Sequence, residues 1–139
     1  MKDELVTCAF TTFNSGKTIE RAIFSAINQT YKNIEIIVVD DNSVDNTVEI
    51  IKNISLKNDI FIKIIELKTN KGVGNARNIC IKNAKGLFIC FFDDDDFSYS
   101  LRVEKQLSKL LEFEINNLTS HYKISALCYA DRYIHYKNK

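Results

Sequence analysis

Apolar runs and helical patterns alternate along this chain from one end to the other. Each apolar run is six or seven residues long and is bounded by polar residues, which is typical of a β-strand. The run at residues 34–39 is rich in Ile and Val, as expected for a strand covered on both faces. We therefore predict strands at residues 5–10, 34–39, 61–67, 87–92 and 124–130.

The segments between these runs carry apolar residues at helical spacing. In the first segment Ile19, Ile23 and Ile27 recur on one face, and we expect Ser15 to cap the helix. We predict helices at residues 16–28, from 45 or 46 through 54, at 74–83 and at 101–117. This alternation of strand and helix predicts an α/β fold, with a Rossmann-like, mainly parallel β-sheet and helices on both faces.

Composition and charge place the chain among ordinary globular proteins. It has 139 residues, 45% hydrophobic and 27% charged, and no linker or repeat divides it, so we expect a single domain over residues 1–139. The formal net charge is +1 and the basic residues are scattered, which argues against nucleic acid as a partner. No apolar run approaches the roughly 18 residues that cross a bilayer, and the acidic N-terminus is unlike a signal peptide. We therefore expect a cytoplasmic protein.

The cysteines and histidines give no evidence for chemistry of their own. The cysteines lack CxxC spacing and lie within apolar segments, so we expect them to be reduced and buried. The two histidines are far apart and have few neighbouring ligands, so we interpret them as surface residues. These residues are Cys8, Cys80, Cys90, Cys128, His121 and His135.

The strongest candidate for chemistry is the run of four aspartates at residues 93–96, directly after the predicted strand at 87–92. Adjacent carboxylates repel one another, and hydrophobic neighbours desolvate them, so such a run favours a bound cation. Hard divalent cations prefer oxygen ligands of this kind. The alternative is a solvated acidic turn.

Two other predicted strands also end in polar residues. The strand at 34–39 leads into Asp40 and Asp41, and the first strand leads into residues 11–14. Ligands of open α/β sheets bind beyond the carboxyl ends of the strands, so we expect the three segments to form one site. Alternatively, Asp40 and Asp41 only end the strand and cap the next helix. A bacterial receiver domain is disfavoured, because its acidic pair follows the first strand.

Residues 70–78 combine a loop with the start of a helix. Gly72 permits close backbone approach, and Arg77 near a helix N-terminus can meet an anion. The alternative is a flexible loop with an exposed arginine. Two nucleotide-binding motifs are disfavoured: Arg77 replaces the third glycine of a dinucleotide fingerprint, and Thr11 replaces the first glycine of a P-loop at residues 11–18.

Taken in order, five segments resemble the donor-binding half of the family 2 inverting glycosyltransferases, which have the GT-A fold. The segments are Thr12-Phe13-Asn14, the Ser-x-x-x-Gln-Thr-Tyr pattern at 25–31, the Ile-Val-Val-Asp-Asp-x-Ser-x-Asp strand end at 37–45, Asn-x-Gly-x-x-x-Ala-Arg-Asn at 70–78, and the Asp-x-Asp metal motif at 93–95. The resemblance covers about residues 5–105. Two prolines common in the family are replaced, by Thr11 and by Ser100.

The resemblance also implies roles for individual residues. Asp95 would bind Mn²⁺ or Mg²⁺ directly, and Asp93 would contact the metal or the ribose. Asp41 would read the uracil or other base, and Asp40 would orient the loop. Arg77 would lie near the diphosphate or the base. The expected nucleotide-sugar-binding residues are Thr11, Phe13, Asp41, Gly72, Arg77, Asp93 and Asp94, and the expected metal ligands are Asp93 and Asp95.

The resemblance implies an enzyme that transfers a sugar from a nucleotide diphosphate sugar, with UDP as the expected nucleotide, to a glycan or lipid-linked acceptor, with inversion. The family's catalytic base lies in its later half, so we name no base: Asp96 and Asp131 are both weak candidates. We expect a chain truncated before the acceptor-binding half, which would be inactive alone. The alternatives are a non-catalytic nucleotide- and metal-binding module, and a nucleotidyltransferase.

Relatives that build surface polysaccharides suggest peripheral association with the inner face of the membrane. The sequence does not determine the sugar, the acceptor or the oligomeric state.

Overall fold

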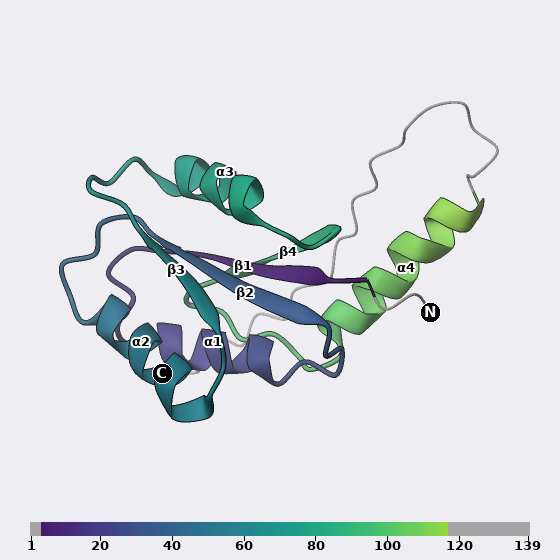
Figure 1. The fold of residues 1–139 in the computed structure, drawn as a ribbon, viewed down its shortest axis with the longest axis horizontal. Helices are drawn as coiled ribbons and strands as arrows, with labels where there is room; N and C mark the ends of the chain where they lie inside the picture. Colours follow the sequence, from purple (N-terminus) through teal and green to yellow (C-terminus); the bar gives the residue numbers. More distant parts are fainter. Residues whose placement is uncertain (1–3, 117–139) are drawn as a thin grey trace, which may run out of the picture.

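The computed structural model describes residues 4–116, with side chains to residue 112, and confirms the predicted α/β fold (Figure 1). The strands are β1 (Val6–Thr12), β2 (Ile34–Asp40), β3 (Ile62–Glu66) and β4 (Phe88–Asp93). The helices are α1 (Ile19–Ile27), α2 (Thr47–Asn58), α3 (Val73–Asn83) and α4 (Arg102–Asn116). The strand predicted at 124–130 lies outside the described residues.

The four strands form one parallel sheet in the order β3-β2-β1-β4. The chain runs outward from β1 to β3 and then crosses back to place β4 on the other side of β1. The direction of winding therefore changes between β1 and β4, where open α/β sheets bind ligands. Register puts Thr12 opposite Asp40 and Thr11 opposite Asp93, so the polar strand ends lie side by side.

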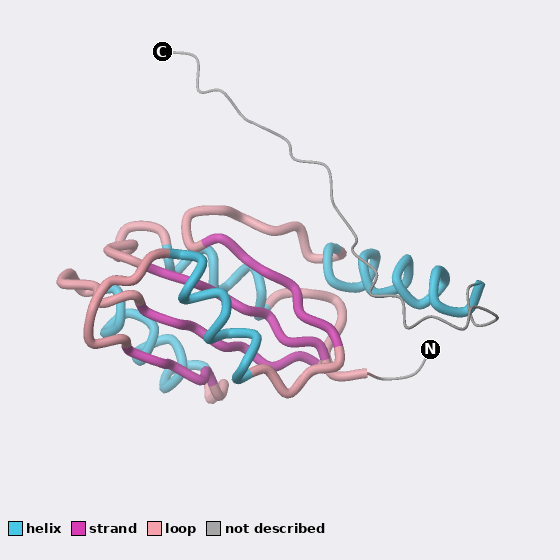
Figure 2. The backbone as a smooth tube through the Cα atoms, turned by 90° about the horizontal axis from the view of Figure 1, so that it is seen from above, coloured by secondary structure: helices cyan, strands magenta, loops and turns pink. Residues whose placement is uncertain are grey.

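Helices cover both faces of the sheet, because the strands are apolar on both sides (Figures 1 and 2). Residues of α1, α2 and α4 pack with Phe10 and Phe92 on one face. Helix α3 covers the other face, where Ala76 and Cys80 pack against Ile37 and its neighbours. Successive residues of each central strand thus point into different cores.

Helix α1 begins three residues later than predicted. Its N-cap is Thr18 rather than Ser15, and no side chain of the described residues caps it. The prediction was wrong because the Thr18 N–H, which a Ser15 cap would bind, donates to the Ser15 carbonyl at 2.9 Å, and the Ser15 hydroxyl donates to Asp94. The backbone donors at the start of the turn bond to another segment. The Ser15 N–H donates to Thr47 Oγ1 at 2.8 Å, and the Gly16 N–H donates to Asp45 Oδ2 at 3.0 Å.

The opposite end of the sheet is held by the half-buried Glu35. Its Oε1 accepts hydrogen bonds from Thr7 Oγ1 at 2.5 Å, from the Lys85 N–H at 2.6 Å and from the Gly86 N–H at 3.1 Å. Burial raises the pKa of Glu35, but these bonds outweigh it and leave the pKa below its usual range. Glu35 thus joins β1 and β2 to the turn that enters β4.

The cysteines in the described part of the chain are free, as predicted. Cys8 and Cys80 are buried and Cys90 is half-buried, while Cys128 lies outside the described residues. Burial raises the pKa of Cys8 well above its usual range, and that of Cys80 to about 11. These thiols therefore pack as small apolar groups.

Candidate functional site

A cleft of about 690 Å³ lies at the carboxyl ends of β1, β2 and β4. Its charged side chains are five aspartates and Lys17, so acidic groups dominate the lining. The lining includes Thr11, Phe13, Asp41, Asp93, Asp94 and Asp95 from the predicted site, together with Thr12, Asn14, Ser15, Lys17, Thr18, Asp45, Val73 and Ala76. The three polar strand ends therefore meet at one cleft, as expected from the strand order, while the predicted Gly72 and Arg77 are outside its lining.

The loops that follow β1 and β2 are tied to each other. The Asn14 N–H donates to Ser43 Oγ at 2.8 Å, and Asn14 Oδ1 accepts from the Val44 N–H at 2.9 Å. Asn14 adopts a positive φ of 53°, which asparagine tolerates better than most residues. The Asp40 carboxylate accepts from the Ser43 N–H at 2.9 Å and from its hydroxyl. Asp40 thus orients the loop that Asn14 holds.

Asp41 is buried and binds the loop that enters α3. Its Oδ1 accepts from the Lys71 N–H at 2.9 Å, and its Oδ2 accepts from the Gly72 N–H at 2.7 Å. Gly72 has φ 85°, a conformation that side chains disfavour. Each carboxylate oxygen can accept a further bond, so base recognition by Asp41 remains a prediction.

Arg77 on α3 reaches across to the end of β4. Its Nη2 lies 3.2 Å from Asp93 Oδ1, and both side chains are about half exposed, at 46% and 44%. The guanidinium also lies over the Phe91 ring, 5.7 Å from the centroid. The predicted anion-binding residue and a predicted metal ligand therefore form an ion pair.

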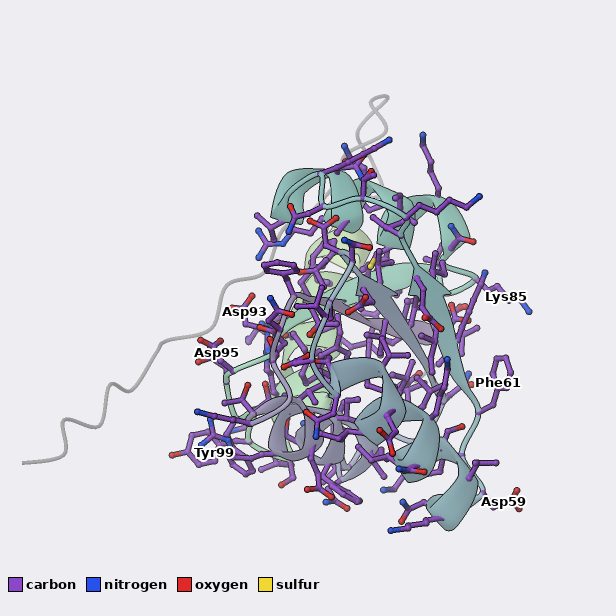
Figure 3. The ribbon with its side chains drawn as sticks, turned by 90° about the vertical axis from the view of Figure 1, so that its left-hand side faces the viewer. Asp59, Phe61, Lys85, Asp93, Asp95 and Tyr99 are labelled. Atoms are coloured by element: carbon purple, nitrogen blue, oxygen red, sulfur yellow. The ribbon has the colours of Figure 1, made fainter. Side chains whose placement is uncertain are left out.

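The four aspartates of the acidic run have different surroundings. Asp94 accepts hydrogen bonds from Ser15 Oγ and, at 3.4 Å, from the Phe13 N–H, so it supports the loop after β1. The Asp95 side chain is exposed and forms no hydrogen bond within the described residues, while Asp96 is exposed as well. Figure 3 shows Asp93 and Asp95 on the same side of the molecule.

The donor set limits how a metal could bind. Among residues 4–112, no group of three or more His, Cys, Asp or Glu side chains is placed to hold a metal ion. Asp93 and Asp95 are hard oxygen ligands that suit Mn²⁺ or Mg²⁺, but two carboxylates leave most coordination positions open. The residues therefore fit a cation whose remaining ligands come from a bound phosphate group and water.

Several residues without a predicted role hold the segment that follows the acidic run. Gln29 at the end of α1 is fully buried: its Nε2 donates to the Tyr99 carbonyl at 2.9 Å, and its Oε1 accepts from the Val103 N–H at 3.0 Å. The Thr30 N–H donates to the Ser100 carbonyl at 2.8 Å. The motif at 25–31 contains Gln29, but its spacing did not reveal this contact.

Two arginines also support the acidic run. Arg102 donates to the Phe91 carbonyl at 2.8 Å and to Ser98 Oγ at 2.7 Å, and it lies over the Phe92 ring at 4.7 Å. Arg21 of α1 donates to the Asp95 carbonyl. Arginines of α4 and α1 thus bind Phe91 before the acidic run, Asp95 within it and Ser98 after it.

Comparison with known proteins indicates the same family as the sequence motifs. Residues 7–133 match the model of "Glycosyl transferase family 2". The chain belongs to this family. It is 42% identical over 106 residues to the UDP-Glc:α-D-GlcNAc-diphosphoundecaprenol β-1,3-glucosyltransferase WfaP of Escherichia coli, an alignment that covers 75% of this chain and 40% of WfaP.

Solved structures agree on the fold. S. aureus TarS 1–349 in complex with UDP-GlcNAc has a TM-score of 0.70 at 30% identity, and the match covers 78% of this chain and 31% of that chain. The mannosyltransferase PcManGT of Pyrobaculum calidifontis, in complex with GDP-Man and Mn²⁺, has a TM-score of 0.71 at 23% identity, over 76% of this chain and 32% of that one. These matches confirm the predicted GT-A fold.

The chain spans half or less of the length of the first four curated relatives it matches, between 35% and 50%. Within residues 4–116, no helix is long and apolar enough to cross a membrane.

Proposed function

We propose that this chain forms the donor-binding part of a glycosyltransferase that takes a sugar from a nucleoside diphosphate sugar, with UDP as the nucleotide. One observation carries the proposal: Asp41, Asp93 and Asp95 line one cleft at the carboxyl edge of the sheet, and Arg77, which is outside the lining, pairs with Asp93. This edge is the place where α/β folds bind nucleotides.

The diphosphate would lie at the β1–β4 end of the cleft. A diphosphate brings negative charge into a lining that is already acidic, so cations must accompany it. Asp93 and Asp95 would hold Mn²⁺ or Mg²⁺, which stabilises the negative charge of the departing nucleotide. Arg77, in the first half of α3, would supply a further positive charge to the phosphates.

The base and ribose would lie toward β2. Asp41 fixes the Lys71–Gly72 backbone and keeps acceptor capacity for a base N–H. Thr11 lines the cleft, and Phe13 is 47% exposed, so its ring offers a flat apolar surface for the base or the ribose. Gly72 lets the backbone approach the ligand closely. Asp94 supports the wall of this half through Ser15.

The reaction would invert the anomeric carbon, through in-line attack by an acceptor hydroxyl that a carboxylate deprotonates. We assign no base to the described residues. The name of WfaP includes a diphosphoundecaprenol-linked GlcNAc, and by analogy we propose a lipid-linked or glycan acceptor in polysaccharide synthesis. Such an acceptor would place the protein in the cytoplasm, at the inner face of the membrane.

Calorimetric titration with UDP, with and without Mn²⁺, tests donor binding directly. We expect UDP to bind more tightly with Mn²⁺, and Asp95→Ala to weaken the metal-dependent part by about tenfold or more, because a ligand is lost. Asp96→Ala is the matched control, since it removes the next carboxylate of the run. Absence of UDP binding, or binding that ignores both Mn²⁺ and Asp95→Ala, would refute the proposal.

The alternative, a module that binds nucleotide and metal but does not catalyse, predicts the same titration. Hydrolysis and transfer assays with UDP-sugars separate the two. Release of free sugar or transfer to an acceptor, lost in Asp95→Ala, supports the enzyme. Tight binding without turnover supports the module or an inactive fragment.

A further inference from the structure

The ion pair between Arg77 and Asp93 conflicts with the roles proposed for its two members. The Asp93 carboxylate is needed by the cation, and the Arg77 guanidinium is needed by the diphosphate. In the structure each is occupied by the other, with Arg77 Nη2 at 3.2 Å from Asp93 Oδ1. A metal at Asp93 would therefore compete with, or lie beside, a positive charge that already engages one of the two carboxylate oxygens.

Arg77 is held in a way that permits its displacement. Within the described residues, its guanidinium makes one hydrogen bond, to Asp93, and a distant ring contact with Phe91 at 5.7 Å, and 46% of its side chain is exposed. Arg102 provides the contrast, because two hydrogen bonds and a closer ring contact of 4.7 Å hold its guanidinium. Arg102 is fixed by its surroundings, whereas Arg77 can change partner at little cost.

We propose that Arg77 occupies the Asp93 carboxylate in the free protein and releases it when a diphosphate draws the guanidinium away, so that cation binding at Asp93 depends on the nucleotide. This inference rests on the donor site proposed above. It adds a role for Arg77 as the residue that keeps the site from binding divalent cations alone. By linkage, the cation and the diphosphate then increase each other's affinity.

The size of the effect follows from the exposure of the pair. A half-exposed ion pair contributes little, and repulsion between a guanidinium and a dication is weakened by water. We therefore expect removal of the Arg77 charge to raise the affinity for Mn²⁺ alone by about threefold to tenfold. The same change should weaken UDP binding, because the phosphates lose a cation.

The test measures Mn²⁺ binding without nucleotide, by calorimetry or by electron paramagnetic resonance of free Mn²⁺, in the wild type and in Arg77→Gln. Lys82→Gln is the matched control, because it makes the same charge change near the end of α3. Arg77→Lys keeps the charge and should largely restore the low affinity. In an Asp93→Asn background, Arg77→Gln should give no gain.

The outcomes separate the inference from the proposed function. The inference is supported if Arg77→Gln binds Mn²⁺ more tightly than the wild type, if UDP then increases the Mn²⁺ affinity of Arg77→Gln less than that of the wild type, and if Lys82→Gln binds Mn²⁺ like the wild type. No gain in Arg77→Gln, an equal gain in Lys82→Gln, or a gain that persists in Asp93→Asn overturns it, even if the wild type binds UDP and Mn²⁺ together. If the wild type binds no UDP with Mn²⁺ present, the donor site itself fails and the inference fails with it.

Discussion

Replacement of Gln29 by alanine should destabilise the whole domain, although Gln29 does not line the cleft. Its side chain is fully buried, and it bonds the Ser25 carbonyl at 2.8 Å, the Tyr99 carbonyl at 2.9 Å and the Val103 N–H at 3.0 Å. Truncation leaves the Tyr99 and Val103 backbone groups without these partners and creates a cavity. The Ser25 carbonyl also loses the hydrogen bond from Gln29.

Each buried polar group left without a partner costs about 1–3 kcal/mol. Two of the three groups, the Ser25 carbonyl and the Val103 N–H, are buried, and water can rescue the part-buried Tyr99 carbonyl. The two buried groups and the cavity together give about 3 kcal/mol for Gln29→Ala. For a domain of this size that corresponds to a fall in Tm of roughly 10 °C. Gln29→Glu keeps the acceptor for Val103 but loses the donor for Tyr99 and buries a charge, so it should be at least as destabilising.

Urea unfolding followed by circular dichroism measures the change. Gln106→Ala is the control, because Gln106 is half-buried on α4 and bonds only a thiol at 3.4 Å within the described residues. It should cost about 1 kcal/mol or less. A loss below 1 kcal/mol for Gln29→Ala, or a loss no larger than that of Gln106→Ala, would show that the Gln29 bonds do not hold the two segments together.

Two further predictions concern the opposite end of the sheet. Because the folded pKa of Glu35 is lowered, its stabilisation is present above its unfolded pKa of about 4.3 and is lost as the pH falls below that value. The free energy of unfolding should therefore fall less in Glu35→Gln than in the wild type between about pH 6 and pH 3, and equal falls would contradict this. Gly86→Ala should destabilise by about 1–3 kcal/mol, because a Cβ there would lie 2.6 Å from the Thr7 backbone nitrogen. Gly74→Ala on α3, where a Cβ meets nothing within 4 Å, should be neutral or stabilising, and thermal melts that rank the two alanine variants the other way would refute the packing argument.

The sequence predicted the fold well because each element carries its own periodic pattern. Strands β2 and β4 were located within about one residue, since their apolar runs end at acidic residues. Strand β1 extends to Thr12, beyond the predicted end at residue 10, because pairing with Asp40 and Asp93 on both sides keeps it extended. Such pairing is a tertiary effect that local apolar patterns do not contain.

The location of the cleft was also predictable, but the hydrogen-bond partners of the residues that line it were not. That Asp40, Asp41 and the acidic run meet at one edge follows from strand order in any parallel sheet. Whether the Asp41 carboxylate binds a backbone N–H group depends on where the loop at residues 70–72 lies. The structure places the Lys71 and Gly72 N–H groups on it. The helix cap expected at Ser15 failed for a similar reason, because the Ser15 hydroxyl donates to Asp94, a residue of a distant segment, instead of capping the helix.

The sequence by itself determined the α/β alternation, the family and the edge of the sheet where the cleft lies. Each of these depends on residue type and on spacing along the chain, which local physics controls. Only the tertiary structure decided which partners Asp93, Asp94 and Asp95 have. Asp94 supports a loop, Asp93 pairs with Arg77, and Asp95 extends into solvent. Identical side chains acquire different surroundings because Asp93 has its partner on α3 and Asp94 in the loop after β1, which only folding brings within hydrogen-bonding distance.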